Sequence, residues 1–244
     1  MSDIEKSGPF KSFGSKVALA VVAVIVVAGL IVAVTSIVRG ATADPSPTST
    51  SVGADGDDDE PVSSSDQSVC GLDGFETESS VEEAPEATWE LVGTVAAPTT
   101  DAGPGEVDGD GFRSCYAHTA EGALLAAIGY FAVGSDSRLA DKLPDLIAEG
   151  EGREAALDNA AGGADPSSTR IQLAGFRVNS YSSSDAVIDV VWSVTSSNGQ
   201  LVSFPTALEW SDGDWKIALT EDGQFPFAAA PVDNLGGYIV WAGV

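Results

Sequence analysis

The sequence is poor in the residues on which most metal and nucleic-acid sites depend. It has one histidine and two cysteines among 244 residues, and 11 basic residues against 37 acidic ones, a formal net charge of −26. One histidine excludes zinc sites built on two or three histidines, and two cysteines exclude a four-cysteine zinc site or iron–sulfur cluster within one chain. The shortage of Lys and Arg argues against nucleic-acid binding, because phosphate contacts need basic clusters. No cofactor is predicted.

Charged residues are also absent from residues 17–38, which read VALAVVAVIVVAGLIVAVTSIV. A hydrocarbon core of about 30 Å needs roughly 20 helical residues, so this segment can span a bilayer. Three lysines lie among the first 16 residues, whereas only Arg39 lies between the segment and residue 113. The positive-inside rule therefore predicts a single-pass cell-membrane protein with a cytoplasmic tail (1–16), a transmembrane helix (17–38) and an extracytoplasmic remainder.

A cleaved signal peptide is the alternative interpretation of the same segment. The small residues of Ala41-Thr42-Ala43 match the pattern that signal peptidase cleaves, which would place the cut after Ala43. The apolar core of a signal peptide is usually about 7–15 residues long, however, and this run is longer. An uncleaved signal anchor is therefore favoured.

Large apolar residues are scarce in residues 39–69, which are rich in Ser, Thr, Pro and Asp. Such a composition cannot bury a core, so the segment is predicted to be a disordered stalk with an r.m.s. span of ~30 Å. An exported domain is expected at 70–244. Residues 40–244 hold 35 of the acids and seven of the bases. This acidity favours solubility, and attraction to a basic partner or divalent cations is the alternative.

The two cysteines, Cys70 and Cys115, both fall in the part predicted to be exported. An even pair of cysteines in an exported chain is typical of a disulfide. The bond would join the end of the stalk to the folded domain.

Hydrophobic periodicity predicts an α+β domain in which helices pack on one face of a curved antiparallel sheet. Thr119 is the expected N-cap of the main helix, and Leu124, Leu125, Ile128, Phe131 and Ala132 form its apolar stripe. Asn198-Gly199 and Asp212-Gly213 are expected hairpin turns, because these residues adopt positive φ at little cost. The predicted helices span 120–133, 137–149 and 153–160, and the predicted strands span 89–95, 170–181, 185–195, 200–210, 215–219 and 237–241.

Several side chains are of types that carry catalysis or bind metal ions in proteins. His118 precedes a helix without a recognised acid or nucleophile partner and is interpreted as a loop or capping residue. Asp108 and Asp110 begin like a calcium loop, but Phe112 and Thr119 stand where further ligands belong, so a turn is predicted. Asp189 alternates onto the polar face of its strand and is expected to be solvated. The tryptophans at 192, 210 and 215 are expected in the core rather than in a pocket.

Three segments resemble a known family: FR at 112–113 with TAEGALLAA at 119–127, WSDGDWKI at 210–217 and GYIVW at 237–241. The chain over about 70–244 resembles an uncharacterised family of actinobacterial membrane-anchored proteins, often carried on mobile or conjugative elements. The Trp-x-Asp-Gly-Asp-Trp hairpin is similar to those of the nuclear-transport-factor-like (cystatin-like) cone fold. Assembly subunits of type IV secretion systems share that fold, so the resemblance implies a structural role in such an apparatus.

The sequence therefore predicts a membrane-anchored extracytoplasmic subunit that binds other envelope proteins or itself and catalyses no reaction. The candidate interaction surface is the last strand, made of Gly237, Tyr238, Ile239, Val240 and Trp241. The alternative is a small-ligand carrier, or an isomerase- or dehydratase-like enzyme, using the pocket of the cone.

Overall fold

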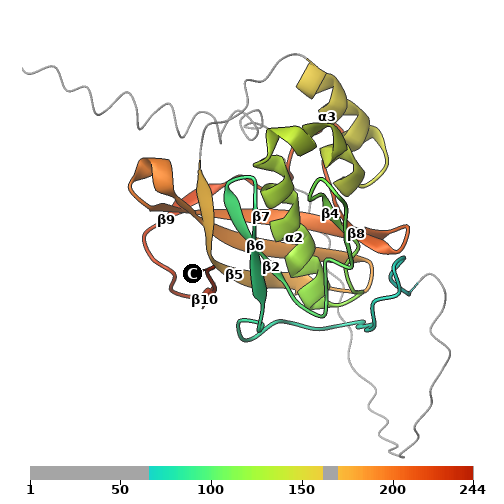
Figure 1. Cartoon of the computed structure of the whole chain (residues 1–244), viewed down its shortest axis with the longest axis horizontal. Helices are drawn as coiled ribbons and strands as arrows, with labels where there is room; N and C mark the ends of the chain where they lie inside the picture. The colour runs from blue at the N-terminus through green and yellow to red at the C-terminus, as the bar shows by residue number, and fades with distance from the viewer. Residues whose placement is uncertain (1–65, 162–169, 244) are drawn as a thin grey trace, which may run out of the picture.

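The computed structural model describes residues 66–161 and 170–243 (Figure 1). The predicted cytoplasmic tail (1–16), the predicted transmembrane helix (17–38) and the predicted stalk as far as residue 65 lie outside the described residues. Within the described ranges, no helix combines the length and apolarity that crossing a membrane requires.

The described chain is an α+β domain, as predicted. Its helical elements are α2 (Ala120–Gly134), the 3-10 helix η1 (Ser137–Leu146), α3 (Glu151–Ala161) and the short 3-10 turn η2 (Thr195–Ser197). Its strands are β1 (Thr88–Val92), β2 (Val95–Thr99), β3 (Glu106–Val107), β4 (Arg113–Ser114), β5 (Ile171–Tyr181), β6 (Asp185–Val194), β7 (Gln200–Ser211), β8 (Asp214–Ile217), β9 (Ala230–Val232) and β10 (Ile239–Val240).

The main sheet has the order β10-β5-β6-β7-β8, with β9 paired to β7, and every strand pair in it is antiparallel. Helix α2 crosses one face of this sheet (Figure 1). The ring of Phe131 on α2 lies 5.3 Å from the Trp192 ring and 4.9 Å from the Phe204 ring, measured between centroids. Aromatic packing of this kind stabilises the contact between the helix and the sheet.

Helix α2 is buried on nearly all sides, rather than along the single stripe that the sequence predicts. The reason is that elements outside the main sheet also cover the helix, because β2 and η1 pack against α2. Small residues make this close packing possible. A Cβ on Gly122 would lie 1.9 Å from the carbonyl oxygen of Ala117, and one on Gly129 would lie 2.2 Å from the Tyr116 hydroxyl.

Two predicted elements take a different form. The single strand predicted at 89–95 is a hairpin of β1 and β2, in which Gly93 turns the chain with φ 56°. The helix predicted at 137–149 is a 3-10 helix containing Pro144. A proline removes an N–H donor and crowds the preceding turn, which opposes a regular α-helix. The remaining predicted helices and strands are present, with ends shifted by a few residues.

Both predicted hairpin turns are confirmed. Asn198 and Gly199 have φ values of 56° and 76°, and Asp212 and Gly213 have φ values of 55° and 78°. The second turn places Asp214 at the start of β8.

Candidate functional site

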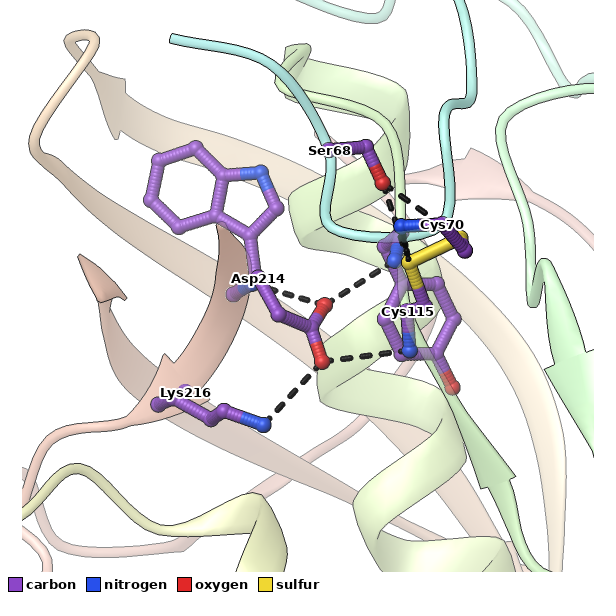
Figure 2. Close-up of a disulfide and its surroundings, with 7 residues drawn as sticks. Ser68, Cys70, Cys115, Asp214 and Lys216 are labelled. Atoms are coloured by element: carbon purple, nitrogen blue, oxygen red, sulfur yellow. Dashed lines mark hydrogen bonds and ion pairs between the residues drawn. A yellow bond between two sulfur atoms is a disulfide. The ribbon is translucent and has the colours of Figure 1, made fainter. Parts of the chain in front are cut away.

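The predicted disulfide between Cys70 and Cys115 is present, with Cα atoms 6.2 Å apart. It lies where the described chain begins, and Figure 2 shows it beside Ser68, Asp214 and Lys216. We call this region the junction and define it as residues 66–70 together with the groups that hold them: Cys115, His118, Gly213 and Asp214. Cys115 is 1% exposed, so the bond attaches residues 66–70 to the interior of the domain.

Asp214 binds the backbone of Cys115 although it lies 99 positions later in the sequence. Its Oδ2 accepts the backbone N–H of Cys115 at 3.1 Å, and its Oδ1 accepts the N–H of Tyr116 at 2.9 Å and that of Trp215 at 2.9 Å. Lys216 also donates to Oδ2 at 3.1 Å (Figure 2). The carboxylate is 4% exposed and is satisfied by these four donors, as a buried charge must be.

Residues 66–69, which the sequence assigns to the end of the stalk, contact two separate segments of the domain, one at 115–118 and one at Gly213. The N–H of Val69 donates to the carbonyl of Gly213 at 2.8 Å, and Ser68 Oγ lies 3.0 Å from the sulfur of Cys115. The carbonyl of Asp66 lies 2.9 Å from His118 Nδ1. Ser68 is 4% exposed, so the chain is fixed before it reaches the disulfide.

His118 is a buried residue of the junction and does not cap α2. The N-cap is Thr119, as predicted, whose side chain accepts the N–H of Gly122 at 3.1 Å. His118 is 1% exposed, and its ring stacks on Trp210 with centroids 3.7 Å apart. Its second ring nitrogen, Nε2, lies 2.5 Å from the carbonyl oxygen of Ser183.

The predicted turn at Asp108 and Asp110 is confirmed. Asp108 Oδ1 accepts the backbone N–H groups of Asp110 and Phe112, both at 2.9 Å. The ammonium of Lys142 lies 2.5 Å from Asp108 Oδ2 and 3.0 Å from Asp110 Oδ2. The hydrogen bond from Lys142, followed by that from the Phe112 amide, lowers the pKa of Asp108 to about 2. The turn thus holds a cationic side chain of the same chain.

The prediction that Asp189 is solvated is wrong, because its side chain is 2% exposed. Ser203 Oγ donates to Oδ1 at 2.6 Å, while Arg177 Nη2 at 3.0 Å and the Tyr238 hydroxyl at 2.9 Å donate to Oδ2. The guanidinium of Arg177 also lies over the Tyr238 ring, 4.7 Å from its centroid. These contacts cover the outer face of the sheet at Asp189 and fasten the C-terminal segment to it.

A sequence signal for this burial was available. Val187 and Val191 flank Asp189 on the same face of β6, and Val191 is fully buried. A single charged residue between two valines on one strand face indicates that other parts of the protein cover that face, since solvent-exposed faces seldom carry such valines. No comparable pattern links His118 to its carbonyl partners.

The five residues of the predicted interaction strand, Gly237 to Trp241, differ in accessibility. Trp241 is 6% exposed and contacts the rings of Phe176 and Trp89, so it belongs to the core. Tyr238 bonds to Asp189, and β10 pairs with β5 at Ile239 and Val240. Val240 is 64% exposed and offers the accessible apolar side chain of this edge strand.

Two hollows on the described surface are lined in part by acids. One of about 570 Å³ lies between residues 76–86 and the start of α2, and its lining includes Glu76, Glu82, Glu83, Glu86 and Glu121. Within residues 66–161 and 170–243, no group of three or more His, Cys, Asp or Glu side chains is arranged to hold a metal ion. Trp192 and Trp215 are 3% and 1% exposed and pack in the core, as predicted.

Comparison with known proteins places the chain in a family without identifying an activity. No curated protein and no solved structure matches it significantly. A family model described as a domain of unknown function, DUF8175, matches residues 48–240, which is most of the chain. The match covers the junction, the main sheet and β10. The chain therefore belongs to the DUF8175 family.

Proposed function

We propose that this protein is a single-pass membrane protein that holds its domain outside the cytoplasm and acts there by binding other proteins. The observation that carries the proposal is the junction: the chain enters the domain through a disulfide and three further contacts within five residues. Disulfides persist in oxidising compartments, which supports an extracytoplasmic domain. A fixed attachment suits a domain that is tethered to an anchor at residues 17–38.

The order of elements supports a more specific assignment to a cone fold of the nuclear-transport-factor type. Helices α2, η1 and α3 precede the consecutive antiparallel strands β5, β6, β7 and β8, and α2 crosses one face of them. Together with the resemblance to actinobacterial proteins of mobile elements, this favours a structural subunit of a conjugative, type IV-like secretion apparatus. Its partners would be envelope proteins or a second copy of the chain.

The exposed side chain of Val240 is the proposed contact point. Strand β10 stands at the edge of the main sheet, where a strand of a partner can add by backbone hydrogen bonds. Leu157 on α3 provides a matched comparison, because it is also an exposed aliphatic residue (45%) but lies on a helix and not on a sheet strand.

Two measurements in the native host test the proposal. Protease added to spheroplasts should remove a C-terminal tag and spare an N-terminal one, and the opposite pattern would contradict the topology. A photo-crosslinking amino acid at position 240 should trap an envelope protein or a second copy, whereas one at position 157 should not. Equal yields at both positions, or none at 240, would contradict the interaction surface.

A further inference from the structure

Both ring nitrogens of His118 face backbone carbonyl oxygens. Nδ1 lies 2.9 Å from the oxygen of Asp66, and Nε2 lies 2.5 Å from the oxygen of Ser183. A carbonyl oxygen only accepts hydrogen bonds, and a neutral imidazole has one N–H and one lone pair. The neutral ring can therefore satisfy one carbonyl while its lone pair faces the other. The imidazolium ion has two N–H groups and satisfies both.

The surroundings of the ring also suit a cation. The His118 ring lies parallel to the indole of Trp210, with an angle of 7° between the planes and 3.7 Å between the centroids. The face of an aromatic ring carries negative potential and attracts a cation placed over it. Trp215 and Phe75 contact the ring at 5.7 Å and 5.0 Å and complete the enclosure. Because His118 is 1% exposed, bulk water does not compete for its N–H groups.

We propose that His118 holds residues 66–69 against the domain more tightly when its ring is protonated than when it is neutral. When the ring is protonated, it donates to Asp66 and to Ser183. When the ring loses a proton, one of these bonds is lost and a lone pair is set against a carbonyl oxygen. Ser183 is held in a turn, in which Ser182 N–H donates to the carbonyl of Asp185 at 2.8 Å. We therefore expect the neutral ring to keep its hydrogen bond to Ser183 and to lose the one to Asp66.

The consequence is that the attachment of residues 66–69 to the domain depends on pH. Rising pH loosens residues 66–69, which keep the Ser68–Cys115 and Val69–Gly213 contacts, while the disulfide keeps Cys70 attached to the domain. The domain can then reorient about Cys70 relative to the chain that precedes it. The reorientation of the domain relative to a membrane tether rests on the proposed function. The protonation-dependent contacts of His118 do not rest on it.

Other titratable groups occur on the segments packed against His118, and they are Asp66, Asp73, Glu76, Tyr181, Asp185, Glu209, Asp212, Asp214 and Lys216. Three of the carboxylates accept bonds from other groups: Glu76 from Ala120 N–H, Asp185 from Ser184 Oγ, and Asp214 from the amides described above. Burial, and secondarily the charge of Glu76, raise the pKa of the Tyr181 hydroxyl, which donates to the carbonyls of Glu76 and His118. Histidine is the side-chain type that ordinarily changes charge between pH 5 and 8.

The test uses the full-length protein in detergent micelles, labelled uniformly with ¹⁵N. Because the chain has one histidine, its ring resonances need no assignment. At acidic pH both ring nitrogens should give imidazolium shifts. As His118 loses its proton, the exchange protection of the Val69 amide, which donates to Gly213, should fall by about tenfold, as expected for one lost hydrogen bond. The amide of Ile188 in the centre of β6 should keep its protection.

The His118→Gln variant is the matched control. Its amide group can donate to one of the two carbonyls only, so protection of Val69 should be low at every pH and independent of pH. Constant protection of Val69 in the wild type while the ring titrates would overturn the proposal, as would neutral-ring shifts throughout the acidic range. Both wild-type measurements stand if the variant does not fold. A reversed membrane topology with the pH dependence intact would contradict the proposed function and leave this inference unaffected.

Discussion

The carboxylate of Asp214 accepts the backbone N–H of Cys115 across 99 positions of sequence. One cysteine of the disulfide is thus positioned by a side chain that is distant in sequence and adjacent in space. This contact makes the β7–β8 hairpin part of the junction, and it explains why a buried acid stands at the start of a short strand.

Replacing Asp214 should destabilise the domain. In Asp214→Asn, an amide NH₂ replaces one acceptor and faces a backbone N–H, so we expect a loss of about 1–3 kcal/mol in the free energy of unfolding. Urea denaturation followed by tryptophan fluorescence measures the change. The control is Asp212→Asn in the same hairpin, because Asp212 is exposed and its positive φ suits asparagine equally well. Equal effects of the two variants would contradict the assigned role of Asp214.

The disulfide should be fully formed in the exported protein. Thiol labelling under denaturing, non-reducing conditions is expected to find no free cysteine. The double variant Cys70→Ala/Cys115→Ala should lose up to about 4 kcal/mol, because the bond closes a loop with a sequence separation of 45 residues. Ser68→Ala keeps the bond and should lose much less. Stoichiometric labelling of both cysteines in protein taken from the host would refute this prediction.

Removing the buried carboxylate of Asp189 should release the C-terminal segment. Asp189→Ala leaves Ser203 and Tyr238 without their acceptor, and we expect a loss of about 2–3 kcal/mol, since half-exposed Arg177 can turn to water. Limited proteolysis should then cut near residue 235 sooner than in the wild type. Asp185→Ala, at an exposed position of the same strand, should leave the cleavage rate unchanged.

Two tyrosines should respond in opposite directions to the loss of a hydroxyl. Among the described residues, the Tyr116 hydroxyl is buried without a hydrogen-bond partner, whereas that of Tyr181 lies 3.1 Å from two carbonyl oxygens, which share its one hydrogen. Tyr116→Phe should therefore stabilise the protein by about 1 kcal/mol, and Tyr181→Phe should destabilise it by a similar amount. Tyr116→Phe should also reduce the damage caused by Gly129→Ala, because that Cβ meets the hydroxyl. Additive effects in this double-mutant cycle would argue against the contact.

The ion pair between Asp108 and Lys142 should produce a pH dependence in the acidic range. The pKa of Asp108 is lowered from its ordinary value of 3.8 to about 2, so its stabilising effect is present above pH 3.8 and disappears as pH falls toward 2. In Lys142→Gln the pKa of Asp108 should rise toward 3.8, which NMR titration of the carboxyl group measures. Arg153→Gln, which removes two other surface ion pairs, should leave that titration unchanged.

Local features of the chain were readable because each depends on a few neighbouring residues. Thr119 caps α2 through an amide three positions later, and the Asn198-Gly199 and Asp212-Gly213 turns follow from backbone preferences. The prediction missed the hairpin of β1 and β2, because its Gly93-Thr94 turn lacks the Asn-Gly or Asp-Gly pair that marks the other two turns.

The sequence by itself determined the α+β class, the order of most elements and the pairing of the two cysteines, since periodicity, turn residues and a cysteine count carry those features. Tertiary structure decided the burial of Asp189, the partners of His118 and the attachment of residues 66–69. The physical reason is that each of these depends on groups brought together from distant segments: Tyr238 reaches Asp189 across 49 positions, and Asp66 meets His118 across 52. Hydrophobic patterning sets which face of a strand is apolar, but only packing decides what covers the other face.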